Sequence, residues 1–263
     1  MAKAMRSLSE LEKKIYIRNV LIPQIGEAGQ VKLLESRVLV IGLGGLGSPA
    51  SLYLAAAGVG EIGLVDSDTV DLSNLQRQVL HGREDVGEDK IRSASRTLSR
   101  LNPDVRLNPI KTAVSAENIL DLVSPYDFVI EATDNFESKF LINDACLRLG
   151  KPYSHAGILG AFGQTMTVVP GKGPCLRCVF EEVPPAGTYE TPDKVGVLGS
   201  VAGVMGTIQA TEAIKCLTGA GRLLVGRMLT WDALGMRFRE VELPAAQRCG
   251  ICGSHDPAIC TER

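Results

Sequence analysis

The sequence predicts an α/β fold in which helices cover both faces of a mostly parallel sheet, and antiparallel strands extend that sheet in the C-terminal half. Three observations lead to this prediction. Apolar runs of strand length alternate with helical segments in the first half of the chain, a glycine-rich turn joins the first run to a helix, and two adjacent strand patterns occur near the C-terminus. The length of 263 residues fits one large domain or two small fused ones, and we expect a single domain.

Local signals place each element in chain order. Ser9 and Glu12 open a short helix with the spacing of a capping box. The apolar segment 37–41 is a strand, and the helix after the glycine turn ends at Gly58, with Ser48 as its expected N-cap. The other predicted strands cover residues 62–66, 105–111, 127–131, 161–169, 228–232 and 236–243. The predicted helices that follow the glycine turn cover residues 50–57, 90–101, 135–150 and 195–217.

Composition and charge exclude several classes of protein. Hydrophobic residues make up 45% of the chain and charged residues 22%, which is typical of a folded globular protein. The net charge of -2 lacks the basic footprint of a protein that binds nucleic acid or an anionic membrane. The N-terminus has no secretory signal, and the uncharged stretch 195–211 is too short and too polar to span a membrane. We therefore expect a cytoplasmic protein with neither a nucleic-acid nor a membrane partner.

The glycine-rich turn has the spacing of a nucleotide-binding loop. Gly42, Gly44 and Gly47 form the pattern G-x-G-x-x-G between a predicted strand and a predicted helix. Asp66 follows Gly47 by 19 residues, at the end of a strand, where an acid can accept hydrogen bonds from ribose hydroxyls. These two features predict a Rossmann-like site for a nicotinamide or flavin dinucleotide or for another adenine nucleotide. A merely structural tight turn is the remaining interpretation.

Charged residues beyond this turn favour a triphosphate over a redox dinucleotide. The segment 66–78 combines acids and amides with Arg77, and Lys90 opens the next predicted helix. A triphosphate carries more negative charge than a dinucleotide pyrophosphate, so it needs cationic side chains and usually a magnesium ion held by a carboxylate. Asp134 provides a carboxylate after the predicted strand 127–131, at the sheet edge where ligands bind. The P-loop pattern G-x-x-x-x-G-K-[ST] does not occur in the sequence.

The chain contains seven cysteines, four of which form two C-x-x-C pairs. Two thiolate pairs without an export signal predict a closed, structural zinc site, with an iron–sulfur or redox role as the alternatives. We expect Cys146 and Cys216 to be buried helix residues. His81, His155 and His255 have no partner spacing, and we expect them to be structural or exposed. The predicted zinc ligands are Cys175, Cys178, Cys249 and Cys252.

The glycine turn, the block 66–78, the triplet 133–135 and the paired cysteines together resemble the MoeB/ThiF family of ubiquitin-activating-type adenylyltransferases. The resemblance runs from about residue 9 to residue 252. It implies ATP-dependent adenylation of the C-terminal glycine of a small ubiquitin-like sulfur carrier that ends in Gly-Gly, with release of pyrophosphate. Such carriers serve molybdopterin or thiamine synthesis.

The resemblance also implies roles for individual residues. Gly44, Gly45 and Asp66 would hold the adenosine. Asp134, with Asn135 beside it, would bind Mg²⁺. Arg18 would reach the phosphates of a neighbouring subunit's site, which would require a homodimer. The residues implied for the phosphates are Ser73, Asn74, Arg77 and Lys90, and those implied for catalysis are Arg77, Lys90, Asp134 and Arg18.

Further expectations concern the second half of the chain. The family often has a cysteine that captures the carrier in a crossover loop, but residues 181–194 contain none, so we expect no covalent capture there. We also expect a separate sulfur donor, because the chain is too short for an appended sulfurtransferase domain. The predicted single domain comprises an N-terminal helical arm (1–35), a nucleotide-binding half (36–154) and a carrier-binding and zinc half (155–263). The alternatives are an NAD-dependent oxidoreductase on the same turn and a non-catalytic carrier-binding partner.

Overall fold

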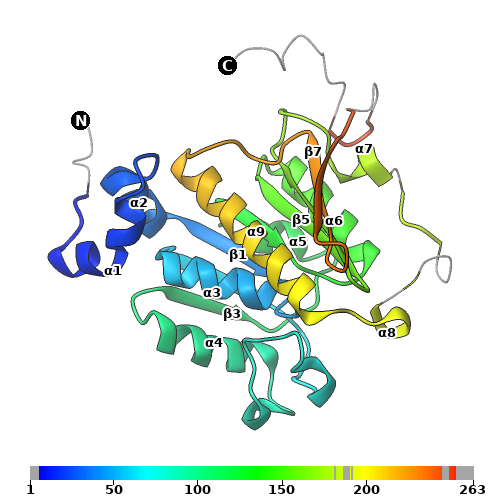
Figure 1. Cartoon of the computed structure of the whole chain (residues 1–263), viewed down its shortest axis with the longest axis horizontal. Helices are drawn as coiled ribbons and strands as arrows, with labels where there is room; N and C mark the ends of the chain where they lie inside the picture. Colours follow the sequence, from blue (N-terminus) through cyan, green and yellow to red (C-terminus); the bar gives the residue numbers. More distant parts are fainter. Residues whose placement is uncertain (1–5, 181, 186–189, 191, 245–248, 253–263) are drawn as a thin grey trace.

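An eight-stranded sheet forms the centre of the computed structural model, which describes residues 6–180, 182–185, 190, 192–244 and 249–252 (Figure 1). The strand order is β3-β2-β1-β4-β5-β6-β7-β8. Neighbours are parallel from β3 to β5 and antiparallel from β5 to β8, which confirms the predicted fold class. The strands are β1 (Arg37–Ile41), β2 (Glu61–Val65), β3 (Arg106–Ile110), β4 (Phe128–Glu131), β5 (Tyr153–Leu159), β6 (Phe162–Val168), β7 (Arg227–Asp232) and β8 (Arg237–Glu242).

Helices cover both faces of this sheet, and strand β1 shows how its sequence supports two layers. Val38 and Val40 belong to one buried apolar cluster, which includes residues of α3, α4 and α9. Leu39 and Ile41 belong to the other cluster, which includes residues of α5 and α6 (Figure 1). The sequence of a strand that is buried on both faces is a continuous run of apolar residues. The helices are α1 (Glu10–Val20), α2 (Gly26–Glu35), α3 (Gly47–Ala57), α4 (Lys90–Leu101), α5 (Ile119–Val123), α6 (Phe136–Arg148), α7 (Leu176–Phe180), α8 (Pro192–Val195) and α9 (Gly199–Thr218).

The N-terminal arm contains two helices. Ser9 caps α1, and the predicted capping box with Glu12 is present. Helix α2 was not predicted separately, because only weak capping signals mark it: its N-cap position is Ile25, which makes no side-chain capping bond. The phenol of Tyr16 in α1 lies 2.9 Å from the amide nitrogen of Asn102, at the C-terminal end of α4. The arm therefore packs at the edge of the molecule where α3 and α4 end.

The other predicted elements are present, but the short helices α5, α7 and α8 were not predicted, and α9 begins at Gly199, after the predicted start at residue 195. Strand β5 was not predicted, because its segment includes the polar residues Ser154 and His155, which are buried through bonds to neighbouring strands. Helix α3 begins at Gly47, so Ser48 lies inside it, and its hydroxyl donates to the Leu43 carbonyl instead of capping the helix. Gly58 is the left-handed C-cap, as expected. No helix in the described part of the chain combines the length and apolar character that a membrane crossing requires.

Candidate active site

The glycine loop between β1 and α3 is built so tightly that side chains do not fit at two of its positions. Gly42 has φ +93°, and a Cβ atom there would lie 2.6 Å from the carbonyl oxygen of Ala132. A Cβ atom at Gly47 would lie 1.8 Å from the carbonyl oxygen of Gly42. Within the described ranges, the N–H groups of Gly44 and Gly45 have no hydrogen-bond acceptor. The loop thus presents two free donors beside the N-terminus of α3, a combination suited to an anion.

Asp66 follows β2 and lies directly against this loop. Its Oδ2 atom accepts a hydrogen bond from the N–H of Leu43 at 2.7 Å, and its Oδ1 atom accepts one from the N–H of Asp68 at 2.8 Å. Each carboxylate oxygen can accept a further hydrogen bond. The carboxylate therefore holds the loop and can still bind hydroxyl groups of a ligand.

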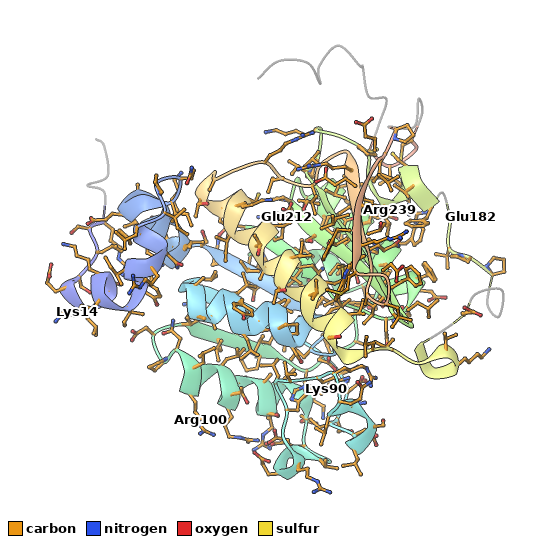
Figure 2. The ribbon with its side chains drawn as sticks, viewed as in Figure 1. Lys14, Lys90, Arg100, Glu182, Glu212 and Arg239 are labelled. Carbon is orange, nitrogen blue, oxygen red and sulfur yellow. The ribbon has the colours of Figure 1, made fainter. Side chains whose placement is uncertain are left out.

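Two cationic side chains reach the same region from the segment after β2. Lys90, the first residue of α4, is almost buried, and its Nζ lies 2.9 Å from Oδ2 of the exposed Asp68 (Figure 2). The Arg77 side chain lies over the glycine loop, since a Cβ atom at Gly45 would lie 3.4 Å from Arg77 Cγ. Arg77 also donates to the Ser73 carbonyl at 3.1 Å. Lys90 thus contacts the segment after β2 that begins with Asp66, and Arg77 contacts the glycine loop.

Ser73 and Asn74 lie in a short 3-10 helix, η1 (Leu72–Asn74), where both side chains have local partners. The Ser73 hydroxyl donates to Asp71 at 2.6 Å, and Asn74 Oδ1 accepts from the N–H of Asp71 at 3.2 Å. Their position places them one turn before Arg77. The structure thus gives them a capping role within η1, and a phosphate contact stays a prediction.

Asp134 lies beside the glycine loop because β4 is the neighbour of β1. Ile41 pairs with Glu131, and the N–H of Ala132 donates to the carbonyl of Ile41 at 2.9 Å. The chain runs from β1 to β2 on one side and reaches β4 on the other, so the strand order reverses at this point. Ligands of open parallel sheets bind outside such a switch point. Asp134 is exposed, and Asn135 caps α6 by accepting from the N–H of Ser138 at 2.8 Å.

Arg18, which was predicted to contact phosphates, lies away from the glycine loop of its own chain. It is in the last turn of α1, and Tyr16 of that helix packs against Gly58, at the end of α3 opposite the glycine loop. Helix α3 has 11 residues and is about 16 Å long. Figure 2 shows Lys14 of α1 and Lys90 on different sides of the molecule. Arg18 therefore does not join the site of its own chain.

A buried polar cluster beneath Asp134 was missed in the sequence. Glu131, at the end of β4, is fully buried and contacts Lys139 of α6 and His155 of β5. Burial by itself would raise the pKa of Glu131, but the charge of Lys139 and the hydrogen bond from His155 outweigh it and hold the pKa at about 2. Burial lowers the pKa of His155, so this ring is neutral and donates from Nδ1 to Glu131 at 2.7 Å. The sequence feature that indicates this cluster is a charged residue at the end of an apolar strand, followed by a lysine in the next helix.

The other two histidines agree with expectation where the structure describes them. His81 is buried, with Nδ1 2.8 Å from the Ser93 hydroxyl and Nε2 3.2 Å from the Leu43 carbonyl oxygen. It is therefore a structural residue that supports the glycine loop. His255 lies outside the described residues.

The four cysteines of the two C-x-x-C pairs come together, as predicted. Their Sγ atoms all lie within 4.8 Å of one another, and no other such group of ligand residues occurs in the described part of the chain. Adjacent sulfurs are 3.5 to 3.9 Å apart. In a tetrahedral zinc site with Zn–S distances of about 2.3 Å, sulfurs lie about 3.8 Å apart. The cluster fits a closed tetrahedral site, with α7 and the segment 249–252 as its two sides.

The chain is similar to several known proteins. The ThiF family matches residues 16–252. The SAMP-activating enzyme E1 of Haloferax volcanii is 45% identical over 94% of this chain and 91% of its own length. The sulfur carrier protein adenylyltransferase of Thermus thermophilus is 42% identical over 90% of each chain. The adenylyltransferase and sulfurtransferase MOCS3 of Sus scrofa is 44% identical, and this chain spans 54% of its length.

A solved structure has the same fold. Escherichia coli MccB in a structure with succinimide has a TM-score of 0.82 and 25% identity, over 94% of this chain and 75% of that one. MccB with ATP has a TM-score of 0.77 and 25% identity, over 86% of this chain and 69% of that one. The family that the glycine turn and the block 66–78 predicted is thereby confirmed. This chain belongs to the ThiF family.

Proposed function

We propose that this protein adenylates the C-terminal glycine of a small ubiquitin-like sulfur carrier, using ATP and releasing pyrophosphate. The observation that supports the proposal is that Asp66 and Arg77 contact the glycine loop and Lys90 contacts the segment after β2. Asp134 follows β4, the other neighbour of β1. Two relatives whose full length this chain nearly covers are named as an adenylyltransferase and an activating enzyme.

In this proposal, Asp66 binds the ribose hydroxyls, and the N–H groups of Gly44 and Gly45 bind the nucleotide beside the N-terminus of α3. Arg77 and Lys90 contact the phosphates, together with Ser73 and Asn74. Lys90 exchanges its ion pair with Asp68 for a phosphate oxygen. Asp68 is the more exposed partner, so water can solvate it after the exchange.

The chemistry requires positioning and charge neutralisation. A carrier carboxylate oxygen attacks the α-phosphorus, and the bond from that phosphorus to the bridging oxygen of the β-phosphate breaks, so pyrophosphate leaves with the electron pair. Attack by one anion on another is slow unless cations lie beside the phosphates. Arg77 and Lys90 neutralise this charge. No side chain needs to act as nucleophile or general base, because the attacking carboxylate is already ionised.

Asp134 is the residue that would hold Mg²⁺, with Asn135 next to it. Its carboxylate is exposed at the sheet edge and, among the described residues, has no hydrogen-bond or ion-pair partner. Carboxylate oxygens are ligands that Mg²⁺ prefers, together with substrate phosphates. When bound, the ion supplies positive charge to the leaving pyrophosphate.

The active form in this proposal is a homodimer in which Arg18 of one subunit completes the site of the other. Arg18 is too far from the glycine loop of its own chain, as described above. Helix α1 also exposes a set of apolar side chains that a second subunit can cover: Leu11, Ile15, Ile17 and Leu21. Exposed apolar surface of this kind is typical of an interface.

The carrier is proposed to bind at the half of the sheet that contains β6, β7 and β8. Strand β8 is the last strand of the sheet, and no other strand within the described residues pairs with its outer edge. An unpaired edge can accept a strand of a partner. We propose a separate sulfur donor, and adenylation without covalent capture of the carrier at residues 181–194, which contain no cysteine.

The cysteine cluster is proposed to hold a structural Zn²⁺ ion. Four thiolates complete a tetrahedron and leave no position for a substrate or water. The ion would link α7 to the segment 249–252. Cysteine thiols stay reduced and able to bind a metal in a reducing compartment, and this supports the proposed cytoplasmic location.

The test is to mix the purified protein with ATP, Mg²⁺ and candidate carriers ending in Gly-Gly, and to weigh the carriers by mass spectrometry. A mass increase equal to one adenylyl group (AMP less one water), with carrier-dependent exchange of labelled pyrophosphate into ATP, is the expected result. Hydride transfer with a nicotinamide would instead support the oxidoreductase alternative. Carrier binding without adenylate or exchange would support a non-catalytic partner.

A further inference from the structure

The ion pair between Glu131 and Lys139 lies directly beneath the loop that contains Asp134. Glu131 is 0% exposed and the Lys139 side chain is 9% exposed. Lys139 Nζ lies 2.9 Å and 3.1 Å from the two carboxylate oxygens of Glu131. The same ammonium group lies 2.7 Å from the Thr133 carbonyl oxygen and 2.8 Å from that of Ala156.

All three polar groups of Thr133 bond to this pair. Its N–H donates to Glu131 Oε1 at 2.9 Å, its hydroxyl donates to the same oxygen at 2.6 Å, and its carbonyl accepts from Lys139. On the other side of Asp134, Asn135 caps α6. The residues on both sides of Asp134 are thereby held in place, while the Asp134 carboxylate itself is exposed.

The pair is poorly explained by stability alone. Burying two charges removes both from water, and apolar residues of similar volume are often at least as stabilising. With His155 neutral, the cluster has no net charge, so it adds little field to the site above it. What the cluster does supply is a fixed backbone at the end of β4. Helix α9 strengthens this, because Gln209 Nε2 donates to the Glu131 carbonyl at 2.8 Å.

We infer that Glu131 and Lys139 are positioning residues that hold Asp134 in the orientation needed to bind magnesium together with the triphosphate. The inference rests on the proposed function, because it assigns the metal to Asp134. The pair acts through Thr133 and touches neither nucleotide nor metal. Its loss should weaken the contribution of Mg²⁺ to nucleotide binding, while binding of the nucleotide without metal should change little.

The main variant is the double substitution Glu131→Gln with Lys139→Met. It removes both charges, so no uncompensated charge remains buried. Thr133→Val is a milder variant, which removes one hydrogen bond and keeps the ion pair. Glu212→Gln is the matched control. Glu212 is a second buried acid, which accepts from the Thr167 hydroxyl at 2.5 Å and the N–H of Leu224 at 2.7 Å (Figure 2).

The measurement is calorimetric binding of the α,β-methylene analogue of ATP to the full chain, with Mg²⁺ and with EDTA. The ratio of the two affinities reports the metal contribution without any turnover. We expect this ratio to fall about tenfold in the double variant, to fall less in Thr133→Val, and to stay at the wild-type value in Glu212→Gln. The single variant Lys139→Arg keeps a cation beside Glu131, so its ratio should lie between the ratios of the double variant and the wild-type protein. Melting curves verify that each variant is folded.

The outcomes separate this inference from the proposed function. If wild-type protein binds the analogue with a clear magnesium dependence and both Thr133→Val and the double variant keep the wild-type ratio, the positioning role is wrong. The same holds if Glu212→Gln lowers the ratio as much as they do. If wild-type protein shows no magnesium-dependent binding, the proposed function fails, and the inference fails with it. If the double variant does not fold, the ratio in Thr133→Val decides.

Discussion

Leu43 of the glycine loop donates its backbone N–H to the carboxylate of Asp66 at 2.7 Å. This bond joins the loop after β1 to the end of β2, so Asp66 is part of the loop's support and of the predicted ribose site. Asp66→Ala removes both functions. We expect ATP affinity to fall at least about tenfold, and the variant to melt at a lower temperature, because the N–H of Leu43 loses its acceptor. Asp66→Asn keeps one acceptor oxygen and should be intermediate in both measurements.

Arg77 and Asp134 should matter for chemistry much more than for folding. Among the described residues, Arg77 donates one hydrogen bond, to the Ser73 carbonyl, and Asp134 is exposed. Arg77→Ala or Asp134→Ala should slow carrier-dependent pyrophosphate exchange on the order of 100-fold or more, with nearly unchanged melting temperature. Arg92→Ala is the control, because Arg92 is an exposed arginine of α4. Exchange near the wild-type rate in either site variant would refute the assignment.

The position of Arg18 makes a prediction about subunits. Arg18→Ala and Asp134→Ala should each be inactive alone, because each lacks one part of a shared site. A mixed dimer contains one site with both residues, so unfolding the two variants together and refolding them should recover about a quarter of wild-type exchange. A site completed within one chain would give no recovery on mixing.

The cysteine cluster predicts about one zinc ion per chain in protein purified without chelators. Cys178→Ser should lose the metal and melt at a lower temperature, because the ion would link two distant segments of the chain. Cys216→Ser is the control: Cys216 is half-buried in α9 and outside the cluster. Elemental analysis together with melting curves makes the comparison, and a metal-free wild-type protein would contradict the zinc assignment.

Stability should fall with acidity in two steps, to both of which the cluster beneath Asp134 contributes. Burial lowers the pKa of His155 in the folded state, so the unfolded chain takes up a proton first, and stability is lost as the pH falls below about 6.5. The pKa of Glu131 is about 2 in the folded protein and 4.5 ordinarily, so its contribution is present above pH 4.5 and is lost between those values. Urea unfolding at several pH values measures both steps. His81 is buried as well, and burial also lowers its pKa, so it contributes to the first step. His155→Gln should therefore reduce the first step, and an unchanged profile in that variant would show that His155 does not contribute to it.

Much of the architecture is encoded in short stretches of sequence. The apolar run of β1, the glycine spacing after it, the capping box at Ser9 and the left-handed glycine at position 58 each depend on neighbours a few residues away. Steric limits on the backbone and local hydrogen bonds determine such features, so a pattern in the sequence suffices. Each C-x-x-C pair is also a short pattern, and it indicates metal binding because four thiolates are a typical ligand set of structural zinc.

Other features exist only once distant segments meet. Strand β5 contains buried polar residues whose partners, Glu131 and Met166, lie on the strands at its two sides, so its segment alone lacks a strand pattern. The Glu131–Lys139 pair is recognisable as a buried pair only after β4 and α6 pack together. The sequence by itself determined the family, the glycine turn and the ligand types. Only tertiary packing decided that Arg18 lies at the end of α3 opposite the glycine loop, and that Thr133, next to Asp134, bonds to a buried ion pair. The physical reason is that burial and the distances between remote residues follow from how the helices and strands assemble.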